Sequence, residues 1–380
     1  FDPPSKRERI EVKPPITRFI RRAVTRVFGV WSRISTQVVR QWDWYPRVEP
    51  YVGYGTGDYS RLICRTVYAP RHAQSGELIR GIRGMLAIPA PRTHVQASID
   101  DMPLNTVQIG VSEVYDKVDR TRDLGSEYAI SDSAGYLDLV AEHRLVPGIR
   151  SEEHRVSYSV ANRKPVSANL YTIPASAKVG IISDVDDTIM ITQAPVPWKA
   201  AYNLLFLDPK KKASVPGMSV LFTRIADLFP GAPFFYLSTS PWNVESSIRN
   251  FITDHGFPEG PLLLRDLDPR PKTFVPTGPQ HKLEFAEQLM ADFPDMKFIL
   301  VGDDGQKDPT TYATIARRYP GRVLAIVIRE LSPRESTGLA SVTGLTSTQP
   351  TPVTDVPVFT GTTGSNILKT MLPYLKTVLR

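Results

Sequence analysis

The second half of the chain alternates short apolar runs with longer amphipathic stretches. Apolar runs that polar residues close are typical of buried parallel strands, whereas apolar positions recurring every three or four residues indicate helices. The runs that predict strands are Gly180–Ser183, Pro233–Leu237, Pro261–Arg265, Phe298–Val301 and Val323–Ile328, and the predicted helices are Trp198–Phe206, Met218–Leu228, Glu245–His255 and His281–Asp292. Strands that alternate with helices form a parallel sheet with right-handed crossovers, so residues 178–380 are predicted to be an α/β domain.

The end of this domain follows a different pattern. Residues 331–355 are rich in Ser, Thr, Gly and Pro, which is typical of a linker or a flexible surface loop. A short strand is predicted at Val356–Phe359, and Pro357 restricts it to the edge of a sheet because proline donates no ladder hydrogen bond. Ser365–Leu379 is predicted to return to the domain as a helix.

Residues 48–177 contain short β-rich runs separated by turn residues, and this spacing predicts a small antiparallel sandwich domain. The runs are Arg61–Tyr68, Ile82–Ile88, Val107–Val114, Leu137–Val140, His154–Val160 and Ala168–Ile173. Gly53, Gly55 and Gly57 are interpreted as turn glycines, because no Gly-Lys-Ser/Thr follows them as in a phosphate-binding loop. The domain shows no catalytic pattern, so we expect it to serve in docking or orientation.

Residues 1–47 are predicted to form a basic arm with an amphipathic helix at residues 16–40. Its apolar positions are Ile16, Ile20, Ala23, Val27, Trp31, Ile34 and Val38, and arginines at 18, 22, 26, 33 and 40 lie on the other face. Such a helix suits an anionic membrane surface. Packing of its apolar face on the rest of the chain, or on a partner subunit, is the alternative.

Charge and cysteine content narrow the possibilities. The 380 residues carry a net charge of +7, and residues 1–50 account for most of it, with eleven Lys/Arg and five Asp/Glu. A basicity confined to one segment argues against a nucleic-acid-binding protein. The single cysteine, Cys64, fits a reducing compartment, and no apolar run is long enough to cross a bilayer. We expect a cytoplasmic, peripheral membrane protein, trimmed ahead of Phe1; whether a targeting segment was removed stays open.

The chemistry is concentrated where the run ending at Ser183 meets Asp184, Asp186, Asp187 and Thr188. Carboxylates packed this closely repel one another, and a divalent cation with hard oxygen ligands, Mg²⁺, would remove that cost. Asp184 and Asp186 are two residues apart, so their side chains point the same way in an extended segment. One of them can attack a substrate while the other handles a proton. The plainer alternative is a strand followed by an acidic turn.

Two further predicted strands end in Ser238 and Asp303, at the same edge of the sheet as Asp184. Phosphoryl transfer needs a nucleophile, a charge clamp and a metal. We expect Asp184 to be the nucleophile and Asp186 the general acid and base. Ser238 is expected to donate to a phosphate oxygen, and Lys282 to neutralise the phosphate. The expected metal site consists of Asp184, Asp186 (through its carbonyl), Asp303 and Asp308, with Asp308, or otherwise Asp304, orienting Asp303. Taken singly, each of these residues also fits a strand cap, a solvated helix position or a turn.

The Asp-x-Asp-x-Thr sequence at residues 184–188 resembles the first motif of the haloacid dehalogenase-like phosphohydrolases. With Asp187 where most members have Gly, it is similar to the actin-patch-associated, Mg²⁺-dependent phosphatidate phosphatase family and its bacterial relatives. Ser-x-Ser-Pro-Trp-Asn at 238–243, Lys282, and Gly302-Asp303 with Asp308 match the later motifs in order. Asp304 and Gln306-Lys307 depart from the usual Ser and Glu-Gln, which affects only the surroundings of the metal site.

The resemblance implies a haloacid dehalogenase-like Rossmannoid sheet, an aspartyl-phosphate intermediate and the conversion of phosphatidate to diacylglycerol at a membrane surface. About 45 residues separate the first motif from the next strand, and about 40 separate Ser238 from Lys282, so we expect no large cap over the site. A phosphatase for a soluble metabolite or a phosphoprotein, and an inactive membrane adaptor, are the alternatives. A phospho-accepting receiver domain would place its phosphorylated Asp in a later strand.

Overall fold

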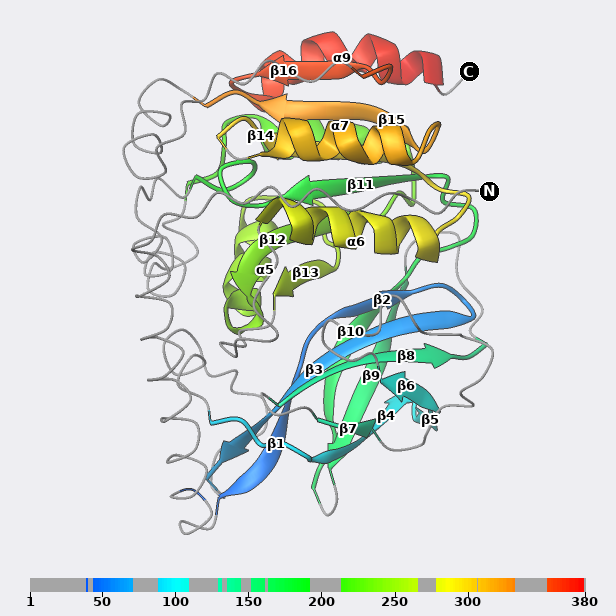
Figure 1. Ribbon diagram of the computed structural model, residues 1–380, viewed down its shortest axis with the longest axis vertical. Helices are drawn as coiled ribbons and strands as arrows, with labels where there is room; N and C mark the ends of the chain where they lie inside the picture. The colour runs from blue at the N-terminus through cyan, green and yellow to red at the C-terminus, as the bar shows by residue number, and fades with distance from the viewer. Residues whose placement is uncertain are drawn as a thin grey trace, which may run out of the picture.

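The computed structural model describes residue 39 and residues 44–70, 88–108, 129–131, 135–144, 152–160, 163–191, 213–265, 278–305, 307–331 and 354–378. Within these residues the chain is α/β, with one parallel sheet and one mixed sheet (Figure 1). Most of the predicted arm, the predicted helix at Trp198–Phe206 and nearly all of residues 331–355 lie outside the described residues.

The C-terminal part of the chain forms a six-stranded sheet in which every pair is parallel. Its strands are β11 (Val179–Asp184), β12 (Phe234–Pro241), β13 (Leu262–Arg265), β14 (Lys297–Asp303), β15 (Val323–Arg329) and β16 (Val358–Gly361), in the order β13-β12-β11-β14-β15-β16. All five predicted strands and the predicted edge strand are confirmed, the latter preceded by Pro357 and placed at the sheet's edge.

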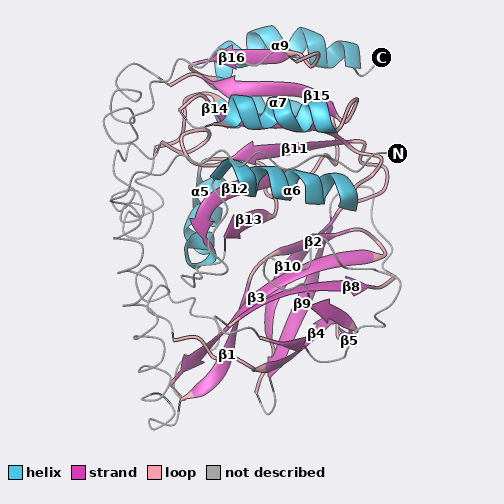
Figure 2. Ribbon diagram, in the orientation of Figure 1, coloured by secondary structure: helices cyan, strands magenta, loops and turns pink. Residues whose placement is uncertain are grey.

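Helices cover both faces of this sheet, as the prediction of a buried parallel sheet requires (Figure 2). The helices α4 (Met218–Leu228), α5 (Glu245–Asp254) and α9 (Gly364–Val378) pack on one face, and α6 (Gly278–Asp292) and α7 (Asp308–Arg318) pack on the other. Alternation along β11 supplies both cores, because Ile181 faces the first group of helices and Ile182 the second.

The order of the strands shows at which point of the sheet edge the predicted site residues meet. β11 comes first in the chain and lies in the middle of the sheet, with β12 and β13 added on one side and β14 to β16 on the other. The connections therefore diverge around β11, and open α/β sheets bind their ligands at such a switch point, beyond the carboxyl ends of the strands. Asp184 at the end of β11 and Asp303 at the end of the neighbouring β14 lie at this position.

The N-terminal part forms a ten-stranded mixed sheet, called here the β-rich region. Its strands are β1 (Tyr45–Pro50), β2 (Gly53–Gly55), β3 (Tyr59–Ala69), β4 (His94–Ile99), β5 (Met102–Pro103), β6 (Thr106–Gln108), β7 (Ala129–Ile130), β8 (Tyr136–Glu142), β9 (Glu152–Val160) and β10 (Val166–Thr172). Side chains from β3, β4, β8 and β9 meet in one apolar cluster, so the sheet curves around its own core. The ladders join all ten strands in one sheet, and the sandwich stays a prediction.

The interpretation of Gly53 and Gly55 as turn glycines was wrong. They form β2, which pairs in parallel with β10 and antiparallel with β3. A Cβ at Gly53 would lie 2.4 Å from the carbonyl oxygen of Arg61, a distance that no side chain tolerates. These glycines therefore permit close approach of two strands, a reason that no local pattern reveals.

The β-rich region also contributes to the two cores of the parallel sheet. Tyr51, Ile63 and Tyr136 join the cluster under α4, α5 and α9, whereas Tyr54 and Tyr171 join the cluster under α6 and α7. The hydroxyl of Tyr54 donates a hydrogen bond to Asp292 at the end of α6, over 2.9 Å. The two sheets thus share apolar side chains on both faces of the parallel sheet. None of the helices in the described residues is long and apolar enough to cross a membrane.

Phe222 on α4 provides a test of this packing, because it is fully buried and its ring lies 5.5 to 5.6 Å from those of Phe257 and Phe234. We expect Phe222→Ala to lower the free energy of unfolding by about 3–5 kcal/mol, measured by urea denaturation, through lost burial and a cavity. Val220→Ala on the same helix is the control, since Val220 is 51% exposed and its loss should change stability by less than about 0.5 kcal/mol. Equal losses would contradict the described orientation of α4.

Candidate active site

The end of β11 brings Asp184 into a buried position. The strand is buried along its whole length, and its side chains from Val179 to Ile182 are apolar. Asp184 is 1% exposed, and its carboxylate oxygens lie 3.0 Å from Nζ of Lys282 and 3.3 Å from the hydroxyl of Thr188, which donates to it. A carboxylate held between an ammonium and a hydroxyl has a single defined orientation toward the sheet edge.

The loop after β11 contains a residue in the left-handed region, Asp187, with φ 55°. Glycine adopts this conformation most readily, and Asp and Asn are the next most tolerant residues. Arg329, at the end of β15, donates a hydrogen bond of 2.7 Å to the carbonyl oxygen of Asp187 and so supports the turn. The backbone conformation accounts for the choice between Gly and Asp at this position of the motif.

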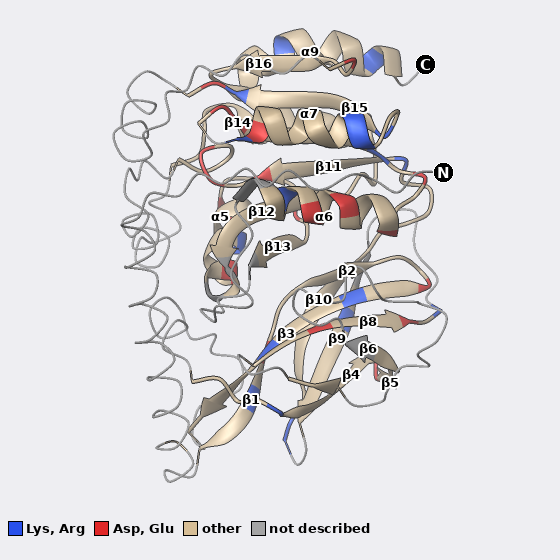
Figure 3. Cartoon of the chain, viewed as in Figure 1, with Lys and Arg blue, Asp and Glu red and all other residues tan. Residues whose placement is uncertain are grey.

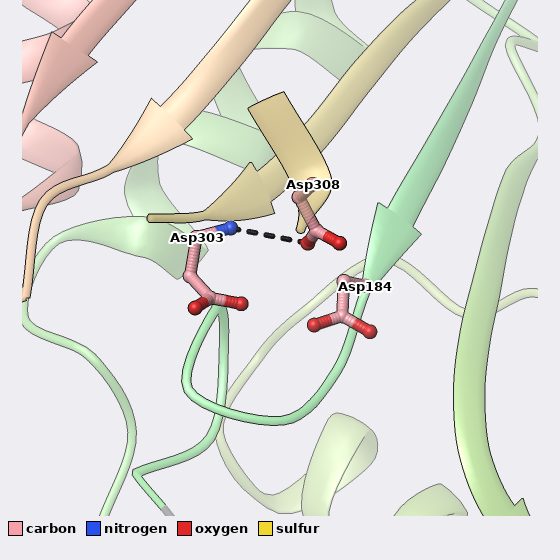
Figure 4. A group of neighbouring side chains, drawn as sticks. All are labelled: Asp184, Asp303 and Asp308. Carbon is pink, nitrogen blue, oxygen red and sulfur yellow. Dashed lines mark hydrogen bonds between the residues drawn. The ribbon is translucent and has the colours of Figure 1, made fainter. Parts of the chain in front are cut away.

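Three carboxylates and one ammonium form the centre of the site, the acid–lysine cluster (Asp184, Asp303, Asp308 and Lys282). Oxygens of the three aspartates all lie within 4.8 Å of one another, and Figure 4 shows them converging from β11, β14 and the start of α7. Nζ of Lys282 lies 2.5 Å from Oδ1 of Asp308, and the backbone N–H of Asp303 donates to Oδ2 of Asp308 over 3.3 Å. Asp308 therefore joins the lysine to the end of β14.

Gly302 makes room for this arrangement. A Cβ at Gly302 would lie 2.4 Å from Oδ2 of Asp308 and 2.7 Å from the ring of Tyr312. Asp308 is the first residue of α7, where the helix dipole favours a negative side chain. The glycine before Asp303 is thus required for the approach of α7 to β14.

Burial and charge shift the protonation equilibria in the cluster. Burial raises the pKa of Asp184 to about 8; Lys282 opposes this rise, while Asp308 and Asp186 add to it. Burial, with the charges of Asp308 and Asp184, also raises the pKa of Asp303 well above its usual range. Burial alone would lower the pKa of Lys282, but the neighbouring carboxylates outweigh that effect and raise it. The lysine is therefore always charged, and the carboxylates need further positive charge to ionise together.

The donor set fits a hard divalent cation. When all are ionised, three carboxylates and one ammonium leave a charge of −2, and all four side chains are buried. Several carboxylate oxygens around one point, without sulfur or imidazole among them, are the ligands that Mg²⁺ prefers. Asp184, Asp303 and Asp308 are the residues placed to hold such an ion directly or through water.

Ser238 and Asp186 form a second contact beside the cluster. The hydroxyl of Ser238 donates a hydrogen bond of 2.8 Å to Oδ2 of Asp186, which is half-buried. The same hydroxyl oxygen accepts a hydrogen bond of 3.0 Å from the backbone N–H of Ser240. An acid and a hydroxyl thus meet at the adjoining ends of β11 and β12, next to the acid–lysine cluster.

The structure brings together nearly all of the residues that the sequence singled out. Asp184, Lys282, Asp303 and Asp308 share one cluster, and Asp186 lies against Ser238 next to it. Figure 3 shows acidic residues, in red, in the loops at the carboxyl ends of β11 and β14. The residue that lies apart is Asp304, whose carboxylate accepts a hydrogen bond from the backbone N–H of Leu331 and so holds a loop.

Three contributors were missed. Thr188 belongs to the first motif, and the motif alone does not predict that its hydroxyl donates to Asp184. His281 is buried beside Lys282, and its Nε2 lies 3.3 Å from the carbonyl oxygen of Ser238. Arg329 is 4% exposed, and an arginine closing an apolar strand was the signal that could have drawn attention to it.

Comparison with known proteins agrees with the motif analysis. Residues 179–330 match the family model described as phosphatidate phosphatase APP1, catalytic domain, which confirms the resemblance. The chain is 28% identical over 217 residues to phosphatidate phosphatase APP1 of Saccharomyces cerevisiae, a match that covers 54% of this chain and 35% of that protein. It is 26% identical over 176 residues to an uncharacterized protein of Schizosaccharomyces pombe, C29B5.04c, covering 46% of this chain and 29% of that one. The matches therefore span about a third of each relative.

Solved structures add no argument about the fold. The tandem Ig repeats of Dlar match 39% of this chain and 62% of that chain, with 11% identity and a TM-score of 0.18. A 2,6-sialyltransferase of Photobacterium matches 87% of this chain and 48% of that chain, with 9% identity and a TM-score of 0.21. Both TM-scores are too low to establish a shared fold.

The raised pKa of Asp184 predicts how stability depends on pH when metal is absent. An unfolded aspartate loses its proton near about pH 4, whereas folded Asp184 keeps its proton up to about pH 8. The folded protein binds more protons over that window, so its free energy of unfolding should decrease as pH rises from about 4 to 8. We expect Asp184→Asn to make this decrease smaller in urea denaturation with a chelator present. Asp295→Asn, an exposed position, should leave it unchanged. An unaltered slope in Asp184→Asn would contradict the assignment.

Proposed function

We propose that this relative of the phosphatidate phosphatases is an Mg²⁺-dependent phosphatase that removes phosphate from phosphatidate through an aspartyl-phosphate intermediate. The observation that carries the proposal is the contact of Lys282 with both Asp184 and Asp308, at 3.0 and 2.5 Å, inside a buried acidic cluster. The match of residues 179–330 to a phosphatidate phosphatase catalytic domain supports the substrate. By this proposal, the parallel sheet is a haloacid dehalogenase-like Rossmannoid domain without a large cap.

In the proposed reaction, a carboxylate oxygen of Asp184 attacks phosphorus and the ester oxygen leaves. Thr188 and Lys282 hold Asp184 at the end of β11, so the nucleophile is positioned before the substrate arrives. Lys282 also keeps one positive charge within reach of the transferred phosphoryl group, where negative charge must be stabilised. Attack requires Asp184 to be ionised, and the ammonium favours that form.

Asp186 is proposed to move the protons. It would protonate the leaving alkoxide in the first step and then take a proton from the water that hydrolyses the aspartyl-phosphate. Its hydrogen bond from Ser238, 2.8 Å long, orients its carboxylate. When the phosphoryl group is bound, Ser238 can instead donate to one of its oxygens, which links substrate binding to release of Asp186 for proton transfer.

Mg²⁺ would be held directly by Asp184, Asp303 and the backbone carbonyl of Asp186, and by Asp308 through water. The charge of −2 in the cluster is the reason to expect a divalent ion. Bound there, the ion would supply positive charge that stabilises the phosphoryl group and lowers the pKa values of the buried carboxylates. Asp308 would then orient both Lys282 and the end of β14 from behind the ion.

Residues 16–40 are proposed to bring the enzyme to its substrate as a peripheral protein on an anionic, cytoplasmic membrane surface. The support is compositional: this segment has no acidic residue, and its arginines and apolar residues alternate at helical spacing. Lys210-Lys211-Lys212 offers further positive charge for headgroups, or is a solvated run.

The first test replaces the nucleophile. Asp184→Asn should lower kcat for Mg²⁺-dependent release of phosphate from phosphatidate vesicles by about 10³-fold or more, because the amide cannot attack phosphorus. Asp295→Asn, at an exposed position, is the matched control and should retain wild-type kcat. The wild-type rate should vanish with a chelator and return with Mg²⁺.

Other outcomes would change the conclusion. Unchanged phosphate release by Asp184→Asn would rule out the proposed chemistry and favour an adaptor. Rapid turnover of a soluble phosphomonoester, with none of phosphatidate, would keep the chemistry and replace the substrate.

The second test concerns the membrane. Removal of residues 16–40 should weaken binding to vesicles of anionic lipid and lower phosphatidate turnover, with turnover of a soluble ester within about twofold of wild type, because the segment contributes surface attraction rather than chemistry. Sedimentation with vesicles and parallel assays of both substrates measure this. An equal loss with both substrates would assign the segment a structural role.

A further inference from the structure

The segment that carries Ser238 is irregular in a way that calls for support. The ladder between β12 and β11 ends at Leu237, and the ladder between β12 and β13 passes from Leu237 directly to Pro241. Four residues advance on β12 while two advance on β13, from Leu263 to Arg265. Residues 238–240 therefore form a bulge of two extra residues, and bulges beside active sites re-aim a side chain at the expense of ladder hydrogen bonds.

Two contacts support the bulge from inside the parallel-sheet domain. The backbone N–H of Ser240 donates to the hydroxyl of Ser238 over 3.0 Å, and Nε2 of His281 lies 3.3 Å from the carbonyl oxygen of Ser238. The first of these is a contact within the bulge itself. After the bulge, the chain passes through Pro241 to Trp242, which begins a short 3₁₀ turn.

The support for Trp242 comes from the β-rich region. Its indole stacks on the ring of Tyr51, with 4.8 Å between ring centroids and 23° between planes, and both side chains are 3% exposed. Tyr51 is itself held, because its backbone N–H donates to the carbonyl oxygen of Ile63 on β3 over 3.0 Å. Tyr51, nearly 190 positions before Ser238 in the chain, thus packs against the segment that follows Ser238.

We propose that Tyr51 is a positioning residue for the phosphatase reaction: by stacking on Trp242 it holds the Ser238–Ser240 bulge, so that the hydroxyl of Ser238 faces Asp186. The inference rests on the proposed function. The β-rich region then completes the active site, which agrees with the expectation of a role in docking or orientation. The bulge lacks the ladder hydrogen bonds that fix the geometry of a regular strand. A buried aromatic stack buries apolar area and also has a preferred geometry, so it can fix the bulge instead.

Tyr54 provides the comparison within the same region. It is also a buried tyrosine of the β-rich region, and its ring and hydroxyl contact Phe235, Phe293 and Asp292 on the other face of the parallel sheet. Tyr54→Ala removes as much apolar surface as Tyr51→Ala but leaves the stack on Trp242 in place. An effect common to both variants would come from weaker packing of the β-rich region on the parallel sheet. An effect of Tyr51→Ala alone would come from the altered bulge.

The kinetic experiment compares variants at a temperature where all of them are folded, as checked by circular dichroism. Tyr51→Ala should lower kcat by about 10–100-fold for both phosphatidate and a soluble ester, with KM for the soluble ester within about threefold, because a misplaced hydroxyl acts on the chemical step. Tyr51→Phe, which keeps the stacking ring, should stay within about twofold of wild type, and so should Tyr54→Ala. Equal losses in the two alanine variants, or in Tyr51→Phe, would overturn the proposal.

A double-mutant cycle separates positioning from a general structural effect. If Tyr51 acts through Ser238, then Tyr51→Ala should change kcat by less than about twofold in a Ser238→Ala background. Multiplicative losses would mean that Tyr51 acts elsewhere, and would overturn the proposal.

Hydrogen exchange tests the same inference without an activity assay. Tyr51→Ala should increase amide exchange in a peptide spanning residues 237–243, and Tyr54→Ala should not. Unchanged exchange in that peptide would refute the positional claim even with an active enzyme. Increased exchange in a protein that releases no phosphate from any ester would instead refute the proposed function and leave the positional claim supported.

Discussion

The contact of Lys282 with Asp184 and Asp308 is the interaction on which the rest of the site depends. Three buried carboxylates around one point would otherwise protonate or repel one another, because burial disfavours every charge that lacks a partner. The lysine reaches them from α6, on the face of the sheet that α7 also covers. Lys282 contacts the end of β11 and the start of α7 at once, so it holds these two elements together at the edge of the sheet where the acids lie.

The parallel arrangement of the strands brings the residues of the acid–lysine cluster together. β11 lies between β12 and β14, and all three run parallel, so their last residues meet at one edge without any further device. The two sides of the edge differ. On the β14 side, Gly302 lets α7 approach and Asp308 fixes the backbone of Asp303; on the β12 side, a bulge replaces regular pairing. Contacts with α6 and α7 thus hold the acids, whereas Ser238 lies in the bulge and depends on other contacts in place of ladder hydrogen bonds.

That dependence gives the β-rich region a physical reason to remain attached to the parallel sheet. Its side chains enter both cores, and Tyr51 stacks on Trp242, just after the bulge. The buried arginine Arg61 lies 5.9 Å from the ring of Phe285 on α6, the helix that carries Lys282. The described part of the β-rich region, to which the proposed reaction assigns no catalytic group, therefore contacts the two elements whose positions that reaction uses most directly.

Local pattern was enough for the parallel sheet and for most of the acidic edge. Apolar runs ending in Asp184, Ser238 and Asp303 predict buried strands and their common edge, because an apolar run indicates burial and a helix between successive strands indicates that they run parallel. Contacts between distant segments decided the remainder: β2 in place of turn glycines, the support of Asp187 by Arg329, and the stack of Tyr51 on Trp242. These features arise only where separate elements pack, and no local rule records which distant side chain will fill a given space. The pairing of Lys282 with Asp308 belongs with them, since helix and strand must first be packed before their charges can meet.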